Sequence, residues 1–422
     1  MLLKIKMMNF GKYSIGIGDR FEKEAPAQLD AIIAANKLGV SITPVWNKSN
    51  REHSTVHSTP ADTRQAADAA VKLRDFKDSY FVDADHINMS NVDKFIDYAD
   101  FFTIDVADYI GLKPVDEVKL KQMLDQLDSL VGHLAIPGLS HPIEITKDQL
   151  IAIVSKFLPA IDEAGKIYTH IKQLKGDLPF ITEVSMDEVD EAQSPVDMLV
   201  ILKMIAETKI PVNTIAPKFT GRFNKGVDYK GDIKKFEQEF EADLLVINYA
   251  IANFGLPANL KVSVHSGSDK FSIYPIIGKL VRKHNSGLHL KTAGTTWLEE
   301  VIGLAKSGGK GLDMAKRIYN DAFNRQDELT KPYASVVEID PAQLPTPQEV
   351  NNWDSNHFVE VLQHDLNNKN YNVSFRQLIH VGYKVAAEAR DEYKNLLDEN
   401  RAVVGKCVTE NILERHIKRI FI

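Results

Sequence analysis

The chain has 422 residues, of which 44% are hydrophobic and 26% are charged, and its formal net charge is −7. This composition is ordinary for a globular protein, and the length suits two or three domains or one large α/β barrel with an appendage. The mildly acidic charge argues against non-specific binding to nucleic acid, which needs a basic surface.

A single cysteine, Cys407, excludes an intrachain disulfide and a thiolate metal cluster. Any metal site must therefore be built from histidine, aspartate and glutamate. The chain has no run of about 18 apolar residues, and its first residues, MLLKIKMMNFGKY, lack the apolar stretch of a signal peptide. We expect a cytoplasmic protein with no membrane partner.

Short apolar, β-branched or aromatic runs alternate with amphipathic segments along most of the chain. Several of the amphipathic segments begin with a helix N-cap followed by proline, as at Thr59-Pro60 and Ser194-Pro195. The runs predict eight strands, over residues 14–17, 40–45, 80–84, 101–106, 180–184, 212–216, 262–265 and 288–292.

Eight strands separated by helices predict parallel pairing and a closed (β/α)₈ barrel of the TIM type over residues 12–325. A doubly wound open sheet is the main alternative, but no G-x-G-x-x-G or P-loop follows any strand. The long interval between the fourth and fifth strands predicts an inserted helical hairpin at 112–178, placed to cap the barrel mouth. Residues 326–422 have no strand signal and predict a helical C-terminal extension packed on the barrel.

Active sites of such barrels lie at the C-terminal ends of the strands, and several polar residues fall there. The third strand ends in Asp83-Ala84-Asp85-His86, and strand alternation turns the two aspartates into the barrel. Glu183 interrupts the apolar fifth strand, where a lone charge is costly unless it is paired or bound to metal. Structural ion pairs and helix caps are the alternative explanation for these acids.

The seventh and eighth strands each carry an inward histidine, His265 and His289. Two imidazoles on neighbouring strands can share one divalent cation, and carboxylate partners would suit Zn²⁺, Mn²⁺, Ni²⁺ or Fe²⁺. A packed core histidine is the alternative for each. We expect simple packing for His380, which follows Leu378 and Ile379 on a helix.

Cationic and small polar residues near the strand ends are candidates for holding an anionic substrate. A pair of cations follows the sixth strand, and a Ser-Gly-Ser turn after the seventh presents backbone N–H groups that suit an anion. The candidate substrate-binding residues are Lys218, Arg222, Ser266, Ser268, Lys270 and Lys291.

Five segments resemble, in the same order, the bacterial tagaturonate/fructuronate epimerases. They are Gly18-Asp19-Arg20-Phe21, Asp83-Ala84-Asp85-His86, Thr182-Glu183-Val184, Val264-His265-Ser266-Gly267-Ser268-Asp269-Lys270-Phe271 and His289-Leu290-Lys291-Thr292-Ala293-Gly294-Thr295. The resemblance covers most of the barrel, and the His-Ser-Gly-Ser-Asp-Lys-Phe stretch is its most specific part.

The resemblance implies a divalent-metal-dependent enzyme that interconverts D-tagaturonate and D-fructuronate at C4 of the ketose. It implies His86, His265 and His289 as metal ligands, and Asp85 and Glu183 as the acid/base pair. Neither the ketone nor the carboxylate is adjacent to C4, so neither acidifies its C–H bond. We therefore expect a retro-aldol route through an enediolate and an aldehyde.

Other functions stay open at this point. The chain suits another metal-dependent aldolase or isomerase of sugar acids, a glycoside hydrolase that uses Asp85 and Glu183, or a protein that binds uronates without converting them. In each enzymatic case we expect a small sugar-acid substrate, no nucleic acid and a possible homo-oligomer.

Overall fold

The computed structural model describes residues 9–112, 116–292 and 294–422. The segment 1–8, on which most of the signal-peptide prediction rests, lies outside the described residues, as do positions 113–115 of the predicted insertion and Ala293 of the eighth-strand motif. No helix in the described part of the chain is both long and apolar enough to cross a membrane.

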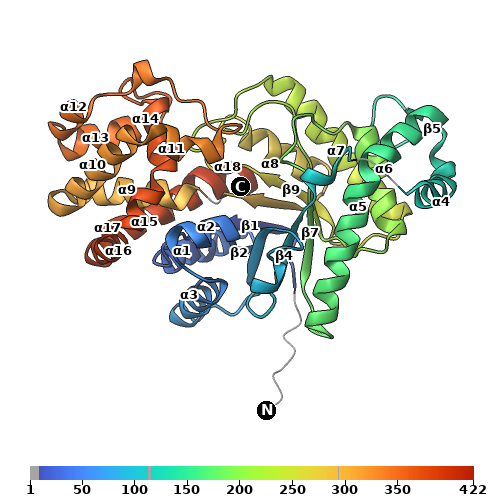
Figure 1. Cartoon of the computed structure of the whole chain (residues 1–422), viewed down its shortest axis with the longest axis horizontal. Coiled ribbons are helices and arrows are strands. Elements are labelled where there is room, and N and C mark those ends of the chain that lie inside the picture. Colours follow the sequence, from blue (N-terminus) through green and yellow to red (C-terminus); the bar gives the residue numbers. More distant parts are fainter. Residues whose placement is uncertain (1–8, 113–115, 293) are drawn as a thin grey trace, which may run out of the picture.

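The predicted eight-stranded parallel barrel is confirmed (Figure 1). Each strand pairs in parallel with its neighbours, and β1 closes the ring against the last strand. In barrel order the strands are β1 (Tyr13–Ile17), β2 (Ile42–Ser49), β3 (Phe81–Ile87), β4 (Phe101–Asp105), β7 (Ile181–Ser185), β8 (Thr214–Ala216), β9 (Lys261–His265) and β10 (Leu288–Lys291).

Helices cover the outside of the barrel, because the outward residues of the strands are apolar and need a partner layer. The covering helices are α1 (Ala25–Lys37), α3 (Pro60–Leu73), α5 (Lys147–Lys175), α6 (Pro195–Glu207), α7 (Ile233–Asn253) and α8 (Tyr274–Lys283). The helices α2 (Asn50–Val56) and α9 (Thr295–Ser307) pack instead against the C-terminal helices. The helix predicted after β3 is reduced to a 3₁₀ turn, Val92–Lys94. Further 3₁₀ turns span Ala107–Tyr109, Asp128–Leu130, Lys331–Tyr333 and Pro341–Gln343.

The predicted insertion is more than a helical hairpin. Its two helices, α4 (Glu117–Leu127) and α5, are joined by an antiparallel ribbon of β5 (Gly132–Leu134) and β6 (Ile143–Ile145). The long helix α5 packs beside α6 and serves as the crossover between β4 and β7. In Figure 1, α4 and β5 lie on the flank opposite the C-terminal helices.

The helical C-terminal extension packs on the barrel through its last helical segments, which contact α1 and α8 and add apolar residues to the barrel's core. Residues 295–305 of α9 are buried without interruption, because the helices of the extension surround this helix. In the structure α10 (Gly309–Asn324), which we assigned to the barrel, packs with the extension, so the extension begins at residue 309 rather than 326. The other helical segments of the extension are α11 (Gln326–Thr330), α12 (Pro347–Asn351), α13 (Ser355–Leu362), α14 (Val373–Val381), α15 (Tyr383–Glu388), α16 (Arg390–Glu399), α17 (Arg401–Glu410), the π-helical turn Asn411–Ile417 and α18 (Lys418–Phe421).

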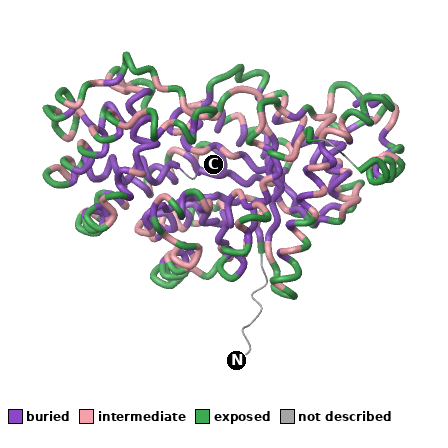
Figure 2. The backbone as a smooth tube through the Cα atoms, in the orientation of Figure 1, coloured by how far each residue is buried: buried purple, intermediate pink, exposed green. Residues whose placement is uncertain are grey.

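Two layers fill the barrel interior. Aromatic and apolar side chains plug the end where the strands begin, with Phe10 packed edge-on against Phe81 and Phe101. The opposite end holds charged residues instead. Figure 2 shows the barrel and its contact with the extension as the buried centre of the molecule, so these charges are enclosed by protein.

The contact between α9 and α17 generates a stability prediction. A Cβ atom on Gly303 of α9 would lie 2.6 Å from Val404 Cα, which is a backbone atom and cannot rotate away. We expect Gly303→Ala to lower the free energy of unfolding by about 1–3 kcal/mol through overpacking, measured by urea denaturation.

Gly405, one residue beyond Val404, is the matched control. Its added Cβ would lie 3.4 Å from the Ala27 Cβ, which is ordinary contact, so Gly405→Ala should be neutral or stabilise helix α17 by about 0.5–1 kcal/mol. Equal effects of the two substitutions would contradict the close approach of these helices.

Candidate functional site

A pocket of about 260 Å³ opens where the barrel strands end, as expected for this fold. On one side it is lined by Asp85, His86 and Asp105, which come from β3 and β4. Other lining residues are Arg20, Arg51, Lys225, Tyr333 and His380. The pocket is therefore strongly polar, with Asp85, His86 and Asp105 near β3 and β4, and with three cations and two further acids, Glu52 and Glu188, elsewhere on the wall.

The two ring nitrogens of His86, at the end of β3, contact different carboxylates. Its Nδ1 lies 2.9 Å from Asp85 Oδ1 and its Nε2 lies 3.7 Å from Asp187 Oδ1. The backbone φ of His86 is +52°, a left-handed conformation that a non-glycine residue adopts at some cost. That turn breaks the strand alternation and brings the imidazole to the pocket wall.

His265, at the end of β9, repeats this arrangement. Its Nε2 lies 2.8 Å from Glu183 Oε1, and its Nδ1 lies 3.1 Å from Asp187 Oδ2. Neither His86 Nε2 nor His265 Nδ1 has a well-formed hydrogen bond within the described residues. Both histidines therefore keep one nitrogen on a carboxylate and turn the other toward Asp187.

The group His86, Asp187 and His265 has the composition of a metal site. One ligand atom from each residue lies within 4.8 Å of the other two. Two imidazoles and one carboxylate suit a first-row divalent cation, and a carboxylate behind each ligand histidine is the usual support. Burial opposes a positive charge on either imidazole, but the nearby carboxylates outweigh it. They raise the pKa of His86 well above its usual value and that of His265 to about 9.

The structure does not bring His289 into this group. Its Nδ1 lies 2.9 Å from Ser14 Oγ, and its ring packs against Phe101 with the centroids 5.2 Å apart. Burial lowers the pKa of His289 well below its usual value, so the imidazole is neutral. Asp187, which takes the third place in the group, was missed because it follows β7 by two residues and strand alternation says nothing about loops.

Lys291 of β10 occupies the centre of the charged layer. Its Nζ lies 2.8 Å from Asp83 Oδ2, 2.8 Å from Asp85 Oδ1 and 3.0 Å from Glu183 Oε1. Burial opposes the positive charge, but the three carboxylates raise the pKa of Lys291 well above its usual value. Burial and the neighbouring acids raise the pKa of Asp83 to about 7. Lys291 therefore neutralises the acids of the barrel itself.

The remaining predicted substrate-binding residues do not line the pocket. Lys270 is fully buried and donates to the carbonyl oxygens of Asn224 and Val227, and Ser268 Oγ accepts from the backbone N–H of Gly226. Ser266 Oγ donates to the Lys291 carbonyl oxygen. Lys218 is half-buried, and the exposed Arg222 pairs with Glu338. The side chains of Ser266, Ser268, Lys270 and Arg222 therefore bond to other parts of the protein.

The C-terminal extension contributes to the pocket wall, and the insertion does not. Tyr333 and His380 of the extension line the pocket, whereas no described residue of 112–178 does. His380, which we expected simply to pack in a core, is buried at the pocket wall, and both of its buried ring nitrogens lack partners among the described residues. The expectation that the insertion caps the mouth is not supported by this lining.

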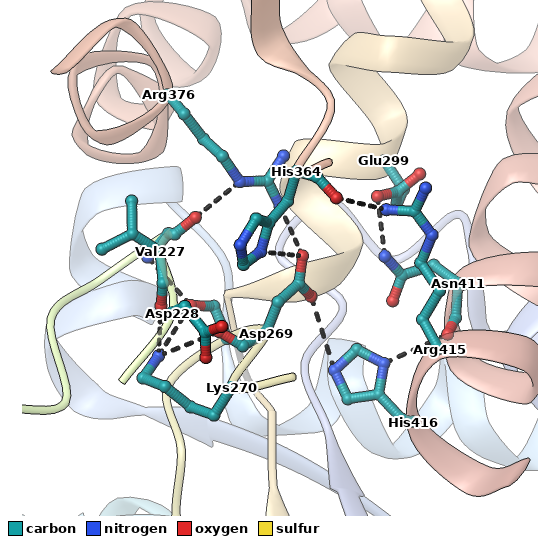
Figure 3. A network of polar contacts seen from close by, with 12 residues as sticks. Val227, Asp228, Asp269, Lys270, Glu299, His364, Arg376, Asn411, Arg415 and His416 are labelled. Carbon is teal, nitrogen blue, oxygen red and sulfur yellow. Dashed lines mark hydrogen bonds and ion pairs between the residues drawn. The ribbon is translucent and has the colours of Figure 1, made fainter. Parts of the chain in front are cut away.

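A buried ionic network fastens the extension to the loop after β9 (Figure 3). Asp269 of that loop lies 2.8 Å from Arg376 Nη2, 3.3 Å from His364 Nδ1 and 3.4 Å from His416 Nε2. Burial favours the neutral acid, but Arg376 and the two histidines outweigh it and hold the pKa of Asp269 well below its usual value. Asp269 thus pairs with residues from three segments of the extension.

Comparisons with known proteins agree with this architecture. The family model described as tagaturonate epimerase matches residues 2–420. A tagaturonate/fructuronate epimerase of Thermotoga maritima is 26% identical over 418 residues, which is 96% of this chain and 80% of that protein. The crystal structure of a fructuronate-tagaturonate epimerase from Cohnella laeviribosi with two glycerol molecules has a TM-score of 0.81 at 23% identity, covering 98% of this chain and 82% of that one. Its native form has a TM-score of 0.80 at 24% identity, with the same coverage.

The position of Lys291 generates a prediction about stability. Lys291→Met leaves Asp83, Asp85 and Glu183 buried without their shared cation, so we expect a loss of about 3–5 kcal/mol in the free energy of unfolding, measured by urea denaturation. The same substitution at the exposed Lys234 should stay within about 0.5 kcal/mol of the parent protein. Similar stabilities for the two variants would show that Lys291 does not neutralise this layer.

Proposed function

Since the chain belongs to the tagaturonate epimerase family and is a carbohydrate epimerase of the isomerase class, we propose that it interconverts D-tagaturonate and D-fructuronate with the help of a divalent cation. One observation carries the proposal: His86 and His265 each bond one nitrogen to a carboxylate and turn the other toward Asp187. A glycoside hydrolase would need two carboxylates but not this histidine arrangement.

His86, Asp187 and His265 are the residues that would hold the cation. The two imidazole nitrogens without well-formed hydrogen bonds are buried and need a partner of some kind, which a cation would supply. When bound, a divalent cation supplies Lewis acidity that polarises the substrate ketone. Asp85 and Glu183 would orient the two imidazoles from behind, and Lys291 fixes both carboxylates in turn.

The reaction itself requires inversion at C4, which is β to the ketone and β to the carboxylate. A base that removes the proton of the 4-hydroxyl allows the C3–C4 bond to break, and its electron pair becomes an enediolate on C2 and C3. C4 becomes an aldehyde carbon. Rotation of the aldehyde presents its other face, and the bond re-forms as the proton returns to the new hydroxyl. No atom or electron is gained or lost.

Asp85 is the candidate proton acceptor for the 4-hydroxyl, because it lines the pocket beside His86. Glu183, the second member of the proposed acid/base pair, is fully buried and bonds to His265, Thr214 and Lys291. Its place beneath the pocket suits a carboxylate that steadies His265 and exchanges a proton across the Lys291 cluster.

The activity is tested by incubating the purified protein with D-tagaturonate or D-fructuronate and following both sugars by NMR. We expect each to give the other, activity to fall on chelation, and activity to return with Zn²⁺, Mn²⁺, Ni²⁺ or Fe²⁺. Turnover that is indifferent to chelation would contradict the Lewis-acid role. Failure to convert either sugar would overturn the proposed function.

The proposed metal ligands can be tested separately from catalysis by measuring metal binding without substrate. Asp187→Asn should weaken binding by more than the roughly 10- to 100-fold that is typical of losing a supporting carboxylate. Asp190→Asn, three residues further along and exposed, should bind metal like the parent protein. Equal affinities for the two variants would place the cation elsewhere.

A separate prediction concerns Asp85. Asn at this position can still accept the hydrogen bond from His86 but cannot take up a proton, so Asp85→Asn should lower kcat roughly 10²- to 10⁴-fold at saturating metal. Its metal affinity should fall by no more than the roughly 10- to 100-fold typical of a lost supporting carboxylate. Asp97→Asn, a change at an exposed residue between β3 and β4, should leave kcat unchanged. An active Asp85→Asn enzyme would show that another group takes the proton.

A further inference from the structure

Helix α14 presents one face of the extension to the barrel mouth. Arg376 and His380 are four residues apart on this helix and therefore lie on the same face. Arg376 Nε donates to the Gly226 carbonyl oxygen at 2.5 Å, and its Nη2 lies 2.8 Å from Asp269 Oδ2 (Figure 3). The anchored arginine thereby fixes the position of His380 one turn further along.

His380 is pressed against two glycines of the barrel loops. A Cβ atom on Gly294 would lie 2.1 Å from His380 Nε2, and one on Gly226 would lie 3.2 Å from His380 Cβ. Burial, with the positive charges of Arg20 and Lys225, lowers the pKa of His380 well below its usual value, so its imidazole is neutral. Both nitrogens of this neutral imidazole are buried without a partner in the described chain, and a buried polar atom needs one, which a ligand at the pocket wall would supply.

Two cations also line the pocket, and Glu188 and Glu52 contribute favourable electrostatics to one of them, Arg51. Neither the Lys225 ammonium nor the Arg51 guanidinium has a hydrogen-bond or ion-pair partner within the ranges that the structure describes. The loop of Lys225 is fastened to the extension by its backbone N–H, which donates to the Val336 carbonyl oxygen at 2.7 Å. The Arg51 guanidinium stacks on Tyr333 of the extension, 4.9 Å from the ring centroid.

Arg20 adds a third positive charge to the same region. Its Nε is engaged by Glu52 at 2.9 Å, but its Nη1 is buried without a partner in the described chain. Its guanidinium stacks on Tyr383, 4.0 Å from the ring centroid, and the Tyr383 hydroxyl bonds to that of Tyr333 at 2.8 Å. The extension thus provides the aromatic support on which both arginines rest.

We propose that Arg51, Lys225 and His380 form the carboxylate-binding end of the pocket, so that the C-terminal extension makes the enzyme selective for sugar acids over neutral sugars. The proposal rests on the proposed function. A carboxylate would be repelled by Asp85 and Asp105 beside His86 and attracted by Arg51 and Lys225, which orients the substrate with its ketone toward the proposed metal group. Of the two acids on the same wall, Glu52 is paired with Arg20, and Glu188 interacts with Arg51. Arg51, Lys225 and His380 are thus specificity-determining residues.

The test compares each sugar acid with its neutral counterpart. D-Tagatose carries a CH₂OH group where D-tagaturonate carries its carboxylate. For Lys225→Met and Arg51→Met we expect KM for D-tagaturonate to rise roughly 10- to 100-fold while kcat changes little, because a hydrogen bond to a charged group is lost. Kinetic constants for D-tagatose should stay within about twofold of the parent enzyme.

Lys230→Met is the matched control, since Lys230 is exposed and pairs with Glu338 outside the pocket. It should change neither sugar's constants. His380→Gln tests the extension's own contribution, and its KM for D-tagaturonate should rise while kcat and the D-tagatose constants are kept. If His380→Gln loses kcat with both sugars, the substitution has disturbed folding. In that case Lys225→Met and Arg51→Met alone test the proposed carboxylate-binding end.

Equal changes with both sugars, or no change with either, in both Lys225→Met and Arg51→Met would overturn the inference and leave the proposed function standing. A parent protein that converts neither D-tagaturonate nor D-fructuronate would overturn the proposed function. In that case the affinity of D-tagaturonate relative to D-tagatose, measured by calorimetry for the same variants, decides the inference by the same ratio.

Discussion

One buried ammonium organises the functional end of this barrel. Lys291 touches Asp83, Asp85 and Glu183 at once, and two of those carboxylates each hold a histidine. The histidines in turn face Asp187. Each contact fixes the group in the next layer, so the orientation of the proposed metal ligands at the pocket wall is set by a lysine that lies beneath them.

Burying charges this deeply is unfavourable, and in this barrel the buried carboxylates around Lys291 are paired with its ammonium. The strand starts are plugged by aromatic rings, which exclude water from below, while the strand ends carry both signs of charge in contact. Removing one member would leave the others unpaired in a low-dielectric interior. The cluster is therefore better explained by a need to place functional groups than by a gain in stability.

Strand alternation predicted which side chains face inward, because the period of two follows from backbone geometry alone. Asp83, Asp85 and His265 point into the barrel as predicted, and Glu183 and Lys291 join them there. Alternation does not predict how far along the barrel axis a side chain lies. His289, the inward residue before Lys291 on β10, lies nearer the strand starts and contacts Phe10 and Phe101. Alternation also predicts no position for Asp187, which lies in a loop, or for His380, whose position depends on how α14 packs on the barrel.

That docking makes the extension part of the site. Asp269, in the loop after β9, is buried and pairs with Arg376 of α14. Without α14, the buried Asp269 carboxylate would lose the guanidinium that neutralises it. The same loop carries Gly267, whose carbonyl oxygen accepts from Gly294 at the pocket wall. A barrel that lacked the extension would thus lose the order of its own mouth along with Tyr333 and His380. The residues after α9 therefore belong to the same functional unit as the barrel.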